Sequence, residues 1–324
     1  MNLTLRTGDQ MPALGLGTWK IPRDVCAETV HAAIAAGYRH LDCACDYGNE
    51  VEVGQGIARA IDEGIVTRED LWITSKLWNT YHRPEHVEPA IRRTLSDLGV
   101  AYLDLYLIHF PISLRFVPFE VRYPPEWVFD PQAEPAQMEF DDVPIATTWA
   151  AMEGLSRAGL TRNIGVCNMT TGFLMDLLAS SSIPPAVLQV EVHPYLTQER
   201  LVRFAAQHDI AVTAFSPLGA GSYISLGMAQ ASQSALEDPV VRAIADRMGA
   251  SPAQVVLAWG IQRGTSVIAK SSSAARLREN LGAAALTLSE DDMAAISGLN
   301  QDRRFNDPGQ FCESAFNTFC PIFD

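Results

Sequence analysis

The chain has little of what marks secreted, membrane or nucleic-acid-binding proteins. No stretch of its 324 residues approaches the roughly 18 apolar residues of a membrane span. Residues 1–12 lack the charged and apolar regions of a signal peptide. The 24 lysines and arginines face 38 aspartates and glutamates, and a net charge of −14 argues against nucleic acid or an anionic membrane as partner. Any phosphate site must therefore gather a few cations locally.

Cysteine is also scarce. The chain has six cysteines scattered along its length, at positions 26, 43, 45, 167, 312 and 320. This distribution is typical of reduced cytosolic thiols and not of a disulfide framework, so we expect a cytoplasmic protein. The remaining composition, 48% apolar and 19% charged, is that of a globular protein with a sizeable core. We expect a monomer or a homodimer.

Strand-like and helical segments alternate along most of the chain. Strands are predicted at 14–18, 40–43, 71–76, 103–109, 163–167, 187–191, 211–215 and 266–270, and helices at 24–36, 49–63, 85–98, 145–158, 170–179, 197–208, 238–248 and 273–282. Strict β/α alternation indicates a parallel sheet. Eight units favour a closed (β/α)8 TIM barrel over an open doubly wound sheet, with residues 1–324 forming one barrel domain.

Five segments lie outside this alternation. Residues 2–12 predict an N-terminal β-hairpin, and residues 289–299 predict an extra C-terminal helix followed by an apolar, aromatic tail at 304–324. Long loops follow the fourth strand, at 111–144, and the seventh, at 217–236. Loops of this length in a compact domain are usually lids or clamps. Both follow strand ends, so both should overhang the same mouth of the barrel.

Four chemically active side chains follow successive predicted strands. Asp42, Lys76 and His109 each close an apolar run, and Tyr47 stands five residues after Asp42. Taken singly, a histidine at a strand end is usually structural and a lysine there usually points to water. Jointly they favour a shared site, because the C-terminal strand ends of a barrel meet at one mouth. A lysine ammonium lowers the pKa of a neighbouring phenol from about 10, which suits proton donation during carbonyl reduction.

At this point the sequence resembles the aldo-keto reductases. The motifs that carry the resemblance are GLGTW (15–19), GYRHLDCACDYGNE (37–50), ITSKLWN (73–79), DLYLIHFP (104–111), IGVCN (164–168), QVEVHPY (189–195), FSPLG (215–219) and AKSSSAARLREN (269–280). The resemblance implies the same barrel and a catalytic tetrad. In that tetrad Tyr47 is the general acid, Lys76 lowers its pKa, Asp42 holds Lys76, and His109 orients the substrate carbonyl.

The cofactor site is not of the Rossmann type. Gly15-Leu16-Gly17 continues as Thr18-Trp19-Lys20, so the third glycine of GxGxxG is missing. Residues 270–273 instead join the last strand to a helix, with Arg276 one turn in. Such a helix N-terminus with flanking cations is typical of a phosphate site, although an ordinary capped helix has the same pattern.

The resemblance implies NADPH, with NADH possible, and assigns residues to each part of the cofactor. The 2′-phosphate would meet Lys270, Ser271 and Arg276, with Ser272 beside them, and the adenine would meet Glu279 and Asn280. Asn168 and Gln189 would hold the carboxamide, and Phe215 would stack on the nicotinamide. Ser216, Leu218 and Ser222 would follow the pyrophosphate, and Gly17, Thr18, Trp19 and Asp42 complete the set. Ser272 stands where xylose reductases often carry Asn, which leaves the preference between NADPH and NADH open.

The substrate site is expected at the same mouth. Its candidate residues are Trp19, Asp46, Tyr47, Trp78, His109, Phe110, Trp127 and Asn306. Residues 109–127 and RFNDP (304–308) resemble the xylose reductase branch, which implies reduction of aldoses such as D-xylose and a hydrogen bond from Asn306 to a sugar hydroxyl. GQFCESAFNTFC (309–320) departs from that branch. A general aldehyde, ketone or sugar-phosphate reductase therefore stays open, as does a non-catalytic NADPH-binding protein.

No metal is expected. His82-Arg83-Pro84-Glu85-His86 matches a zinc-protease pattern. Proline is tolerated only at the start of a helix, so His82 should lie outside the helix and the two histidines should not share a face.

Overall fold

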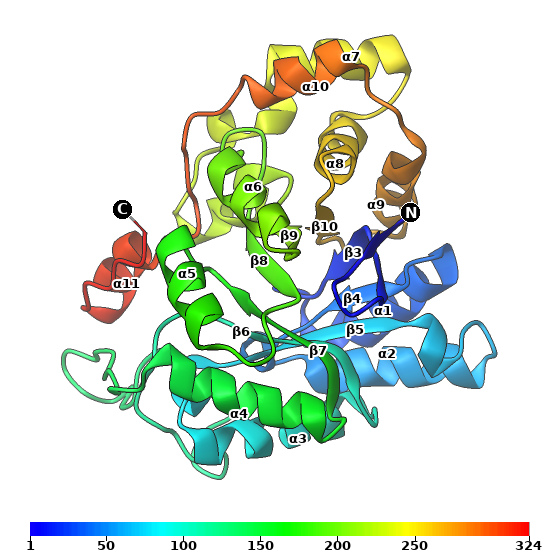
Figure 1. Ribbon diagram of the computed structural model, residues 1–324. Coiled ribbons are helices and arrows are strands. Elements are labelled where there is room, and N and C mark those ends of the chain that lie inside the picture. The colour runs from blue at the N-terminus through cyan, green and yellow to red at the C-terminus, as the bar shows by residue number, and fades with distance from the viewer. Residues whose placement is uncertain (324) are drawn as a thin grey trace.

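The structure, a computed structural model that describes residues 1–323, is a closed parallel barrel (Figure 1). Its strands pair in the order β10-β3-β4-β5-β6-β7-β8-β9. They are β3 (Leu14–Gly17), β4 (His40–Asp42), β5 (Trp72–Leu77), β6 (Leu103–Ile108), β7 (Thr161–Cys167), β8 (Val187–Glu191), β9 (Ala211–Phe215) and β10 (Ser266–Ala269). The predicted (β/α)8 fold is confirmed. Within residues 1–323 no helix is both long and apolar enough to cross a bilayer.

Helices surround the barrel between the strands. They are α1 (Arg23–Ala36), α2 (Glu50–Asp62), α3 (Pro84–Leu98), α4 (Ile145–Arg157), α5 (Thr171–Ser180), α6 (Glu199–Gln207), α8 (Pro252–Gln262) and α9 (Ala274–Leu281). Helices α1 and α3 end at Gly37 and Gly99, whose φ angles of 117° and 65° reverse the chain at no steric cost. Because α3 begins at Pro84, His82 lies before the helix, as the sequence predicted.

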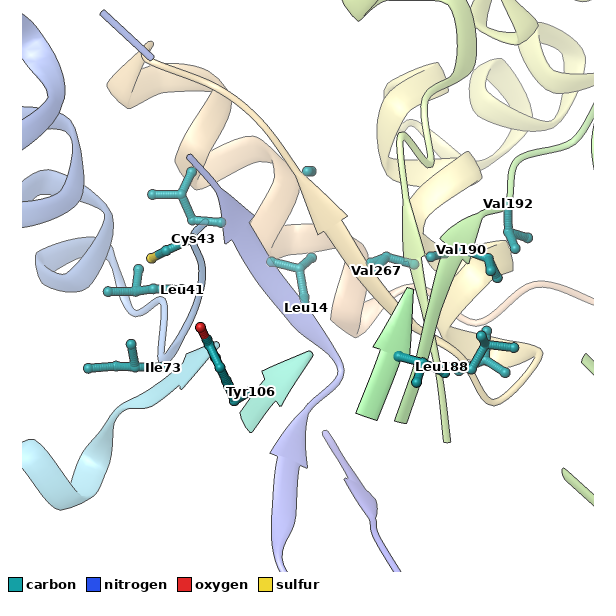
Figure 2. Packing of buried hydrophobic residues seen from close by; sticks show 14 of the residues in the cluster. Leu14, Leu41, Cys43, Ile73, Tyr106, Leu188, Val190, Val192 and Val267 are labelled. Atoms are coloured by element: carbon teal, nitrogen blue, oxygen red, sulfur yellow. The ribbon is translucent and has the colours of Figure 1, made fainter. Parts of the chain in front are cut away.

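Two apolar cores follow from the alternation of side chains along the strands. Residues such as Leu41, Ile73, Tyr106, Leu188 and Val267 pack against the helices in the larger core (Figure 2). Their neighbours in sequence, among them Leu105, Leu107, Cys167 and Val187, fill the barrel interior. The interior core also contains Leu5 and Met11 from the N-terminal hairpin, β1 (Asn2–Thr4) and β2 (Gln10–Pro12). The hairpin therefore plugs the end of the barrel opposite the strand C-termini.

The glycines of the GLGTW motif have a packing role. A Cβ on Gly15 would lie 2.6 Å from Ile268 Cδ1 and 2.9 Å from His40 Cγ, and one on Gly17 would lie 2.9 Å from Ile268 Cγ2. Any side chain at either position would collide with β10 or with His40 in the barrel interior. The pair is therefore required where β3 pairs with β10, independently of any nucleotide.

The seventh barrel helix differs from the sequence prediction. Helix α7 (Pro239–Met248), predicted at 238–248, packs on α8, whereas α8 itself lies against β10 and α9. Helix α8 is therefore the helix that connects β9 to β10 against the barrel, and the sequence did not predict it. Its residues from Val255 to Ile261 are all buried, so it lacks the one-sided apolar stripe by which surface helices are identified in a sequence.

The two long loops and the tail complete the chain. The loop after β6 folds back on itself through a bridge between Leu114 and Phe140, and the loop after β9 winds through short 3-10 turns over 219–222, 224–226, 231–233 and 235–237. Further 3-10 turns span 45–47, 68–70, 79–81 and 282–285. The chain ends with α10 (Glu290–Ser297), which lies beside α7, and α11 (Pro308–Phe316), a helix within the predicted tail (Figure 1).

Candidate active site

Lys76 lies at the centre of a polar cluster where the strands end. Its side chain is 1% exposed, and Nζ donates to Asp42 Oδ2 at 2.9 Å, to the Cys43 carbonyl oxygen at 2.8 Å and to the Tyr47 hydroxyl oxygen at 3.0 Å. These contacts use all three ammonium hydrogens. An ammonium has no lone pair, so the Tyr47 oxygen is the acceptor. The Tyr47 hydroxyl hydrogen therefore remains free for another partner.

Asp42 is held from both sides. Gln189 Nε2 donates to Asp42 Oδ1 at 2.7 Å, while Lys76 takes the other carboxylate oxygen. The Asp42 carbonyl oxygen accepts from both the backbone N–H and the hydroxyl of Thr18, at 3.0 Å each. The carboxylate is therefore fully engaged and positions the ammonium beside Tyr47.

The pKa of Tyr47 differs from the expectation. Burial raises it above its ordinary value, and this exceeds the lowering produced by the Lys76 ammonium. The sequence-based expectation of a net lowering was wrong, because it left the desolvation of the phenolate out of account. Lys76 itself is subject to burial, which acts to lower its pKa, but Asp42 and Tyr47 outweigh burial and the net shift is upward. At neutral pH the pair is a phenol and an ammonium.

His109, just after β6, is almost completely buried. Its ring packs on Phe110 and edge-on against Trp78, and it lies 5.9 Å from the Tyr47 ring, centroid to centroid. Burial, with a smaller contribution from the Lys76 charge, lowers its pKa well below the ordinary value. A neutral imidazole has one nitrogen that donates and one that accepts. His109 can therefore donate a hydrogen bond without carrying a charge.

A cavity of about 740 Å³ opens over this cluster. It brings together most of the side chains expected to bind cofactor or substrate: Gly17, Trp19, Asp42, Asp46, Tyr47, His109, Phe110, Trp127, Asn168, Gln189, Phe215, Ser216, Leu218, Ser222, Lys270, Arg276 and Asn306. Asn168 and Ser216 adopt the left-handed backbone region, with φ of 56° and 48°. Positive φ in residues other than glycine is uncommon and clusters at functional sites.

Lys76 does not line this cavity, and neither do six of the residues expected to bind cofactor or substrate. Thr18 and Trp78 are fully buried behind its wall, and Trp78 Nε1 donates to the Glu126 carbonyl oxygen. The Ser271 hydroxyl accepts from the Ser273 N–H at 3.1 Å, so Ser271 and not Ser273 supplies the side-chain contact before α9. The others are Ser272, Glu279 and Asn280, and Asn280 is buried near Tyr38.

Three cations line the cavity, and two of them, Lys20 and Lys270, lie close enough for their charges to interact. Lys20, Lys270 and Arg276 line it, and none forms an ion pair within residues 1–323. Lys20 Nζ donates to the Ser222 carbonyl oxygen at 3.0 Å and to Ser225 Oγ at 2.7 Å, which ties the strand β3 end to the loop after β9. Burial and the nearby Lys270 charge lower the pKa of Lys20. The cavity therefore offers positive charge that suits an anion.

Sequence reasoning missed several lining residues, including Lys20, Tyr223, Phe311 and Phe316. Lys20 directly follows a strand-end motif, which was a usable signal. Helix α11 was also detectable, because Asp307-Pro308 is a typical N-cap and first position, and the Asp307 side chain accepts from the Gly309 N–H. That its Phe311 and Phe316 rings would contact Trp127 from the loop after β6 had no local signal.

Comparisons with known proteins identify relatives over nearly the whole chain. The model of the Aldo/keto reductase family matches residues 13–301. A probable NAD(P)H-dependent D-xylose reductase of Emericella nidulans is 50% identical over 95% of this chain and 96% of its own. The NAD(P)H-dependent D-xylose reductases of Scheffersomyces stipitis and Aspergillus niger are 48% and 47% identical, over 95% and 98% of this chain and 96% and 98% of theirs. The chain therefore belongs to the aldo/keto reductase family.

Proposed function

We propose that the protein is an NADPH-dependent reductase that converts aldoses such as D-xylose to alcohols. The observation that carries this proposal is the Tyr47 hydroxyl, held 3.0 Å from the Lys76 ammonium with its own hydrogen free, in the wall of the large cavity. Relatives of about half identity over nearly the whole chain are named NAD(P)H-dependent D-xylose reductases, which supports both the reaction and the substrate.

The cavity has the chemistry that NADPH requires. Lys20, Lys270 and Arg276 offer unpaired positive charge for its phosphates, and the wall residue Phe215 offers an aromatic face. Gln189 donates an amide hydrogen to Asp42, and Asn168 donates one to the His109 carbonyl oxygen. Gln189 Oε1 accepts a long contact from Cys167 Sγ at 3.9 Å, and both amide oxygens retain a lone pair that can accept from a carboxamide. A dianionic 2′-phosphate gains most from the unpaired cations, so NADPH should be preferred over NADH. When bound, the dihydronicotinamide supplies a hydride to the carbonyl carbon.

The residues of the chain handle the proton and the developing charge. Tyr47 gives its free hydrogen to the carbonyl oxygen as negative charge develops there, and Lys76 stabilises the phenolate left behind. The raised pKa of Tyr47 keeps the proton on the oxygen until it is needed. Neutral His109 donates a second hydrogen bond that orients the carbonyl. Asp42 keeps Lys76 charged and in place.

The substrate end of the cavity combines polar groups with aromatic walls. Asp46 and Asn306 provide hydrogen-bonding groups for a polyhydroxy chain. Burial and the Glu126 charge raise the pKa of Asp46 to about 7, so the carboxyl can both donate and accept near neutral pH. The aromatic wall of Phe311, Phe316 and Trp127 favours a second candidate, reduction of hydrophobic aldehydes at the same site.

One panel tests the proposal and separates the two substrates. Steady-state kcat/KM is measured for D-xylose, a sugar phosphate, an aromatic aldehyde and a ketone, each with NADPH and with NADH. The aldose proposal expects measurable xylitol formation and a higher kcat/KM with NADPH. Turnover of the aromatic aldehyde without any of D-xylose would favour the second candidate, and no turnover despite tight NADPH binding would contradict both.

The cellular setting is part of the proposal. All six cysteines are buried free thiols, which supports a reducing compartment, and we propose the cytoplasm. A monomer or a homodimer is expected, and sedimentation equilibrium distinguishes the two.

A further inference from the structure

A buried carboxylate of the barrel, Glu191, holds the C-terminal tail beside the cavity. Glu191 is the last residue of β8 and is fully buried, yet it does not line the cavity. Its Oε1 accepts from the Phe305 N–H at 2.9 Å and its Oε2 from the Asn306 N–H at 2.8 Å. His193 Nε2 lies 2.9 Å from Oε1. The barrel thus grips two consecutive amides of the segment that presents Asn306.

A buried carboxylate is costly unless its oxygens are satisfied. Here both oxygens are engaged, and two of the three donors belong to a segment 114 and 115 residues away in sequence. The Glu191 carbonyl oxygen accepts in addition from Gln198 Nε2 at 2.7 Å, which fixes the backbone at the strand end. The contacts therefore set the position of residues 305 and 306 relative to the barrel.

Tyr223 holds the same segment from the loop after β9. Its ring stacks on Phe305 at 5.7 Å, centroid to centroid, and its hydroxyl lies 2.8 Å from Ser216 Oγ. The Trp19 ring also packs against the Tyr223 ring, with their centroids 5.7 Å apart. The Asn306 side chain lies close to the Tyr223 hydroxyl. Asn306 is thus approached through its backbone by Glu191 and through its side chain by Tyr223.

We propose that Glu191 and Tyr223 are positioning residues that fix Asn306 for recognition of a substrate hydroxyl. Neither needs to touch the substrate. The inference rests on the proposed function, in which Asn306 contacts the sugar. It adds that selectivity for hydroxylated aldehydes depends on a carboxylate and a phenol outside that contact.

A double-mutant cycle tests this. The measured quantity is the KM for D-xylose divided by the KM for butanal, which has no hydroxyl group. Asn306→Ala should raise this ratio about tenfold, the size expected for one hydrogen bond. Glu191→Gln keeps the volume but turns an amide NH2 toward a backbone N–H, and should raise the ratio by a similar factor. If Glu191 acts through Asn306, the double variant should match Asn306→Ala alone.

Multiplicative effects in the double variant, or an unchanged ratio in Glu191→Gln, would overturn the proposal. Glu50→Gln is the matched control, because Glu50 is also a buried glutamate, and its hydrogen bonds come from Ser75 and Thr94 and not from the tail. A general loss of packing would change both KM values together and leave the ratio where it was.

A second readout is independent of turnover. Amide hydrogen exchange at residues 305 and 306 should accelerate in Glu191→Gln and not in Glu50→Gln, because only the former loses their acceptor. Unchanged exchange there contradicts the positioning role whatever the substrate is. Accelerated exchange with no effect of Asn306→Ala on the KM ratio would instead contradict the assignment of Asn306 to the sugar.

Tyr223→Phe provides the other arm. It removes the hydroxyl near Ser216 and Asn306 and keeps the ring stacked on Phe305. The KM ratio should rise, and the rise should vanish in the Asn306→Ala background. Tyr102 lies just before β6 at the opposite end of the barrel, and its hydroxyl accepts from Arg162 of β7. Tyr102→Phe should therefore leave the ratio unchanged. An equal rise in both variants would contradict the role of Tyr223.

Discussion

In the proposed mechanism, Tyr47 donates the proton and Lys76 stabilises the charge that remains on its oxygen. Burial keeps the Tyr47 proton in place, and the ammonium stabilises the phenolate only once the proton has left. Asp42 is needed because an unpaired ammonium with 1% exposure would lose its charge to desolvation. The site is therefore a buried ion pair whose ammonium donates a hydrogen bond to a phenol.

The ion pair predicts a separation of stability from activity. Lys76→Met leaves Asp42 buried without its partner, and the free energy of unfolding should fall by about 3–5 kcal/mol. Adding Asp42→Asn removes the uncompensated charge, so the double variant should recover part of that loss while remaining inactive. Urea unfolding and turnover measure the two effects. If the double variant is no more stable than Lys76→Met, the claim that an unpaired Asp42 charge destabilises the single variant is contradicted.

The cations that line the cavity predict cofactor selectivity. Lys270→Met or Arg276→Ala removes a charge that lacks an ion-pair partner within residues 1–323, so little structural loss is expected. The KM for NADPH should rise about tenfold or more, since a hydrogen bond to a charged group is worth about 1.5–3 kcal/mol, and the KM for NADH should rise much less. Equal increases for both cofactors would show that these residues do not meet the 2′-phosphate.

At the scale of residues, the sequence was sufficient to predict which side chains meet at the site. The strand-end positions of Asp42, Lys76 and His109 predicted that they would meet, because parallel strands of a barrel share one mouth. The direction of the Tyr47 pKa shift could not be predicted in the same way. It depends on how deeply the phenol is buried, and that is set by the packing of segments remote in sequence.

At the scale of elements, Glu50 joins three of them. It begins α2, accepts from Ser75 of β5 at 2.6 Å and accepts from Thr94 of α3 at 3.1 Å. Burial raises its pKa to about 7, and the Asp97 charge adds to this, while the two hydroxyl donors oppose it. Glu50 is therefore a protonated acid within the helix layer over much of the acidic range.

This predicts a pH dependence of stability. Because the folded pKa of Glu50 lies above the unfolded value, unfolding releases a proton between about pH 4.5 and 7, and the stability due to Glu50 is lost as pH rises through that range. The free energy of unfolding of the wild type relative to Glu50→Gln should fall by about 3 kcal/mol from pH 4.5 to 7.5. Urea titrations at several pH values measure it. A difference that is constant with pH would contradict the buried-acid interpretation.

Elements with a one-sided apolar face could be predicted, and those without one could not. Helices α2 and α3 carry such a face and were located to within a residue or two. Helix α8 is buried all round and has no stripe to detect, so α7 was assigned to its position. Periodicity reports a boundary between core and solvent, and α8 has no such boundary along its buried turns.

At the scale of the whole molecule, the barrel is closed at one end and functional at the other. Leu5 and Met11 of the hairpin fill the interior at the strand N-termini, and two long loops and the tail surround the mouth at the C-termini (Figure 1). The alternating pattern predicted the barrel and the overhanging loops. The contacts that join Glu191 to Asn306, or Trp127 to Phe316, link distant segments and leave no trace in local sequence.

The central claim is that the Tyr47 hydroxyl delivers the proton, and Tyr47→Phe tests it most directly. Phenylalanine keeps the ring and removes only the oxygen that Lys76 contacts. NADPH affinity, measured by fluorescence titration, should stay within about twofold of the wild type. The kcat/KM for D-xylose should fall by about a thousandfold, within the usual range for a general acid. Turnover within tenfold of the wild type, with NADPH bound normally, would contradict the account.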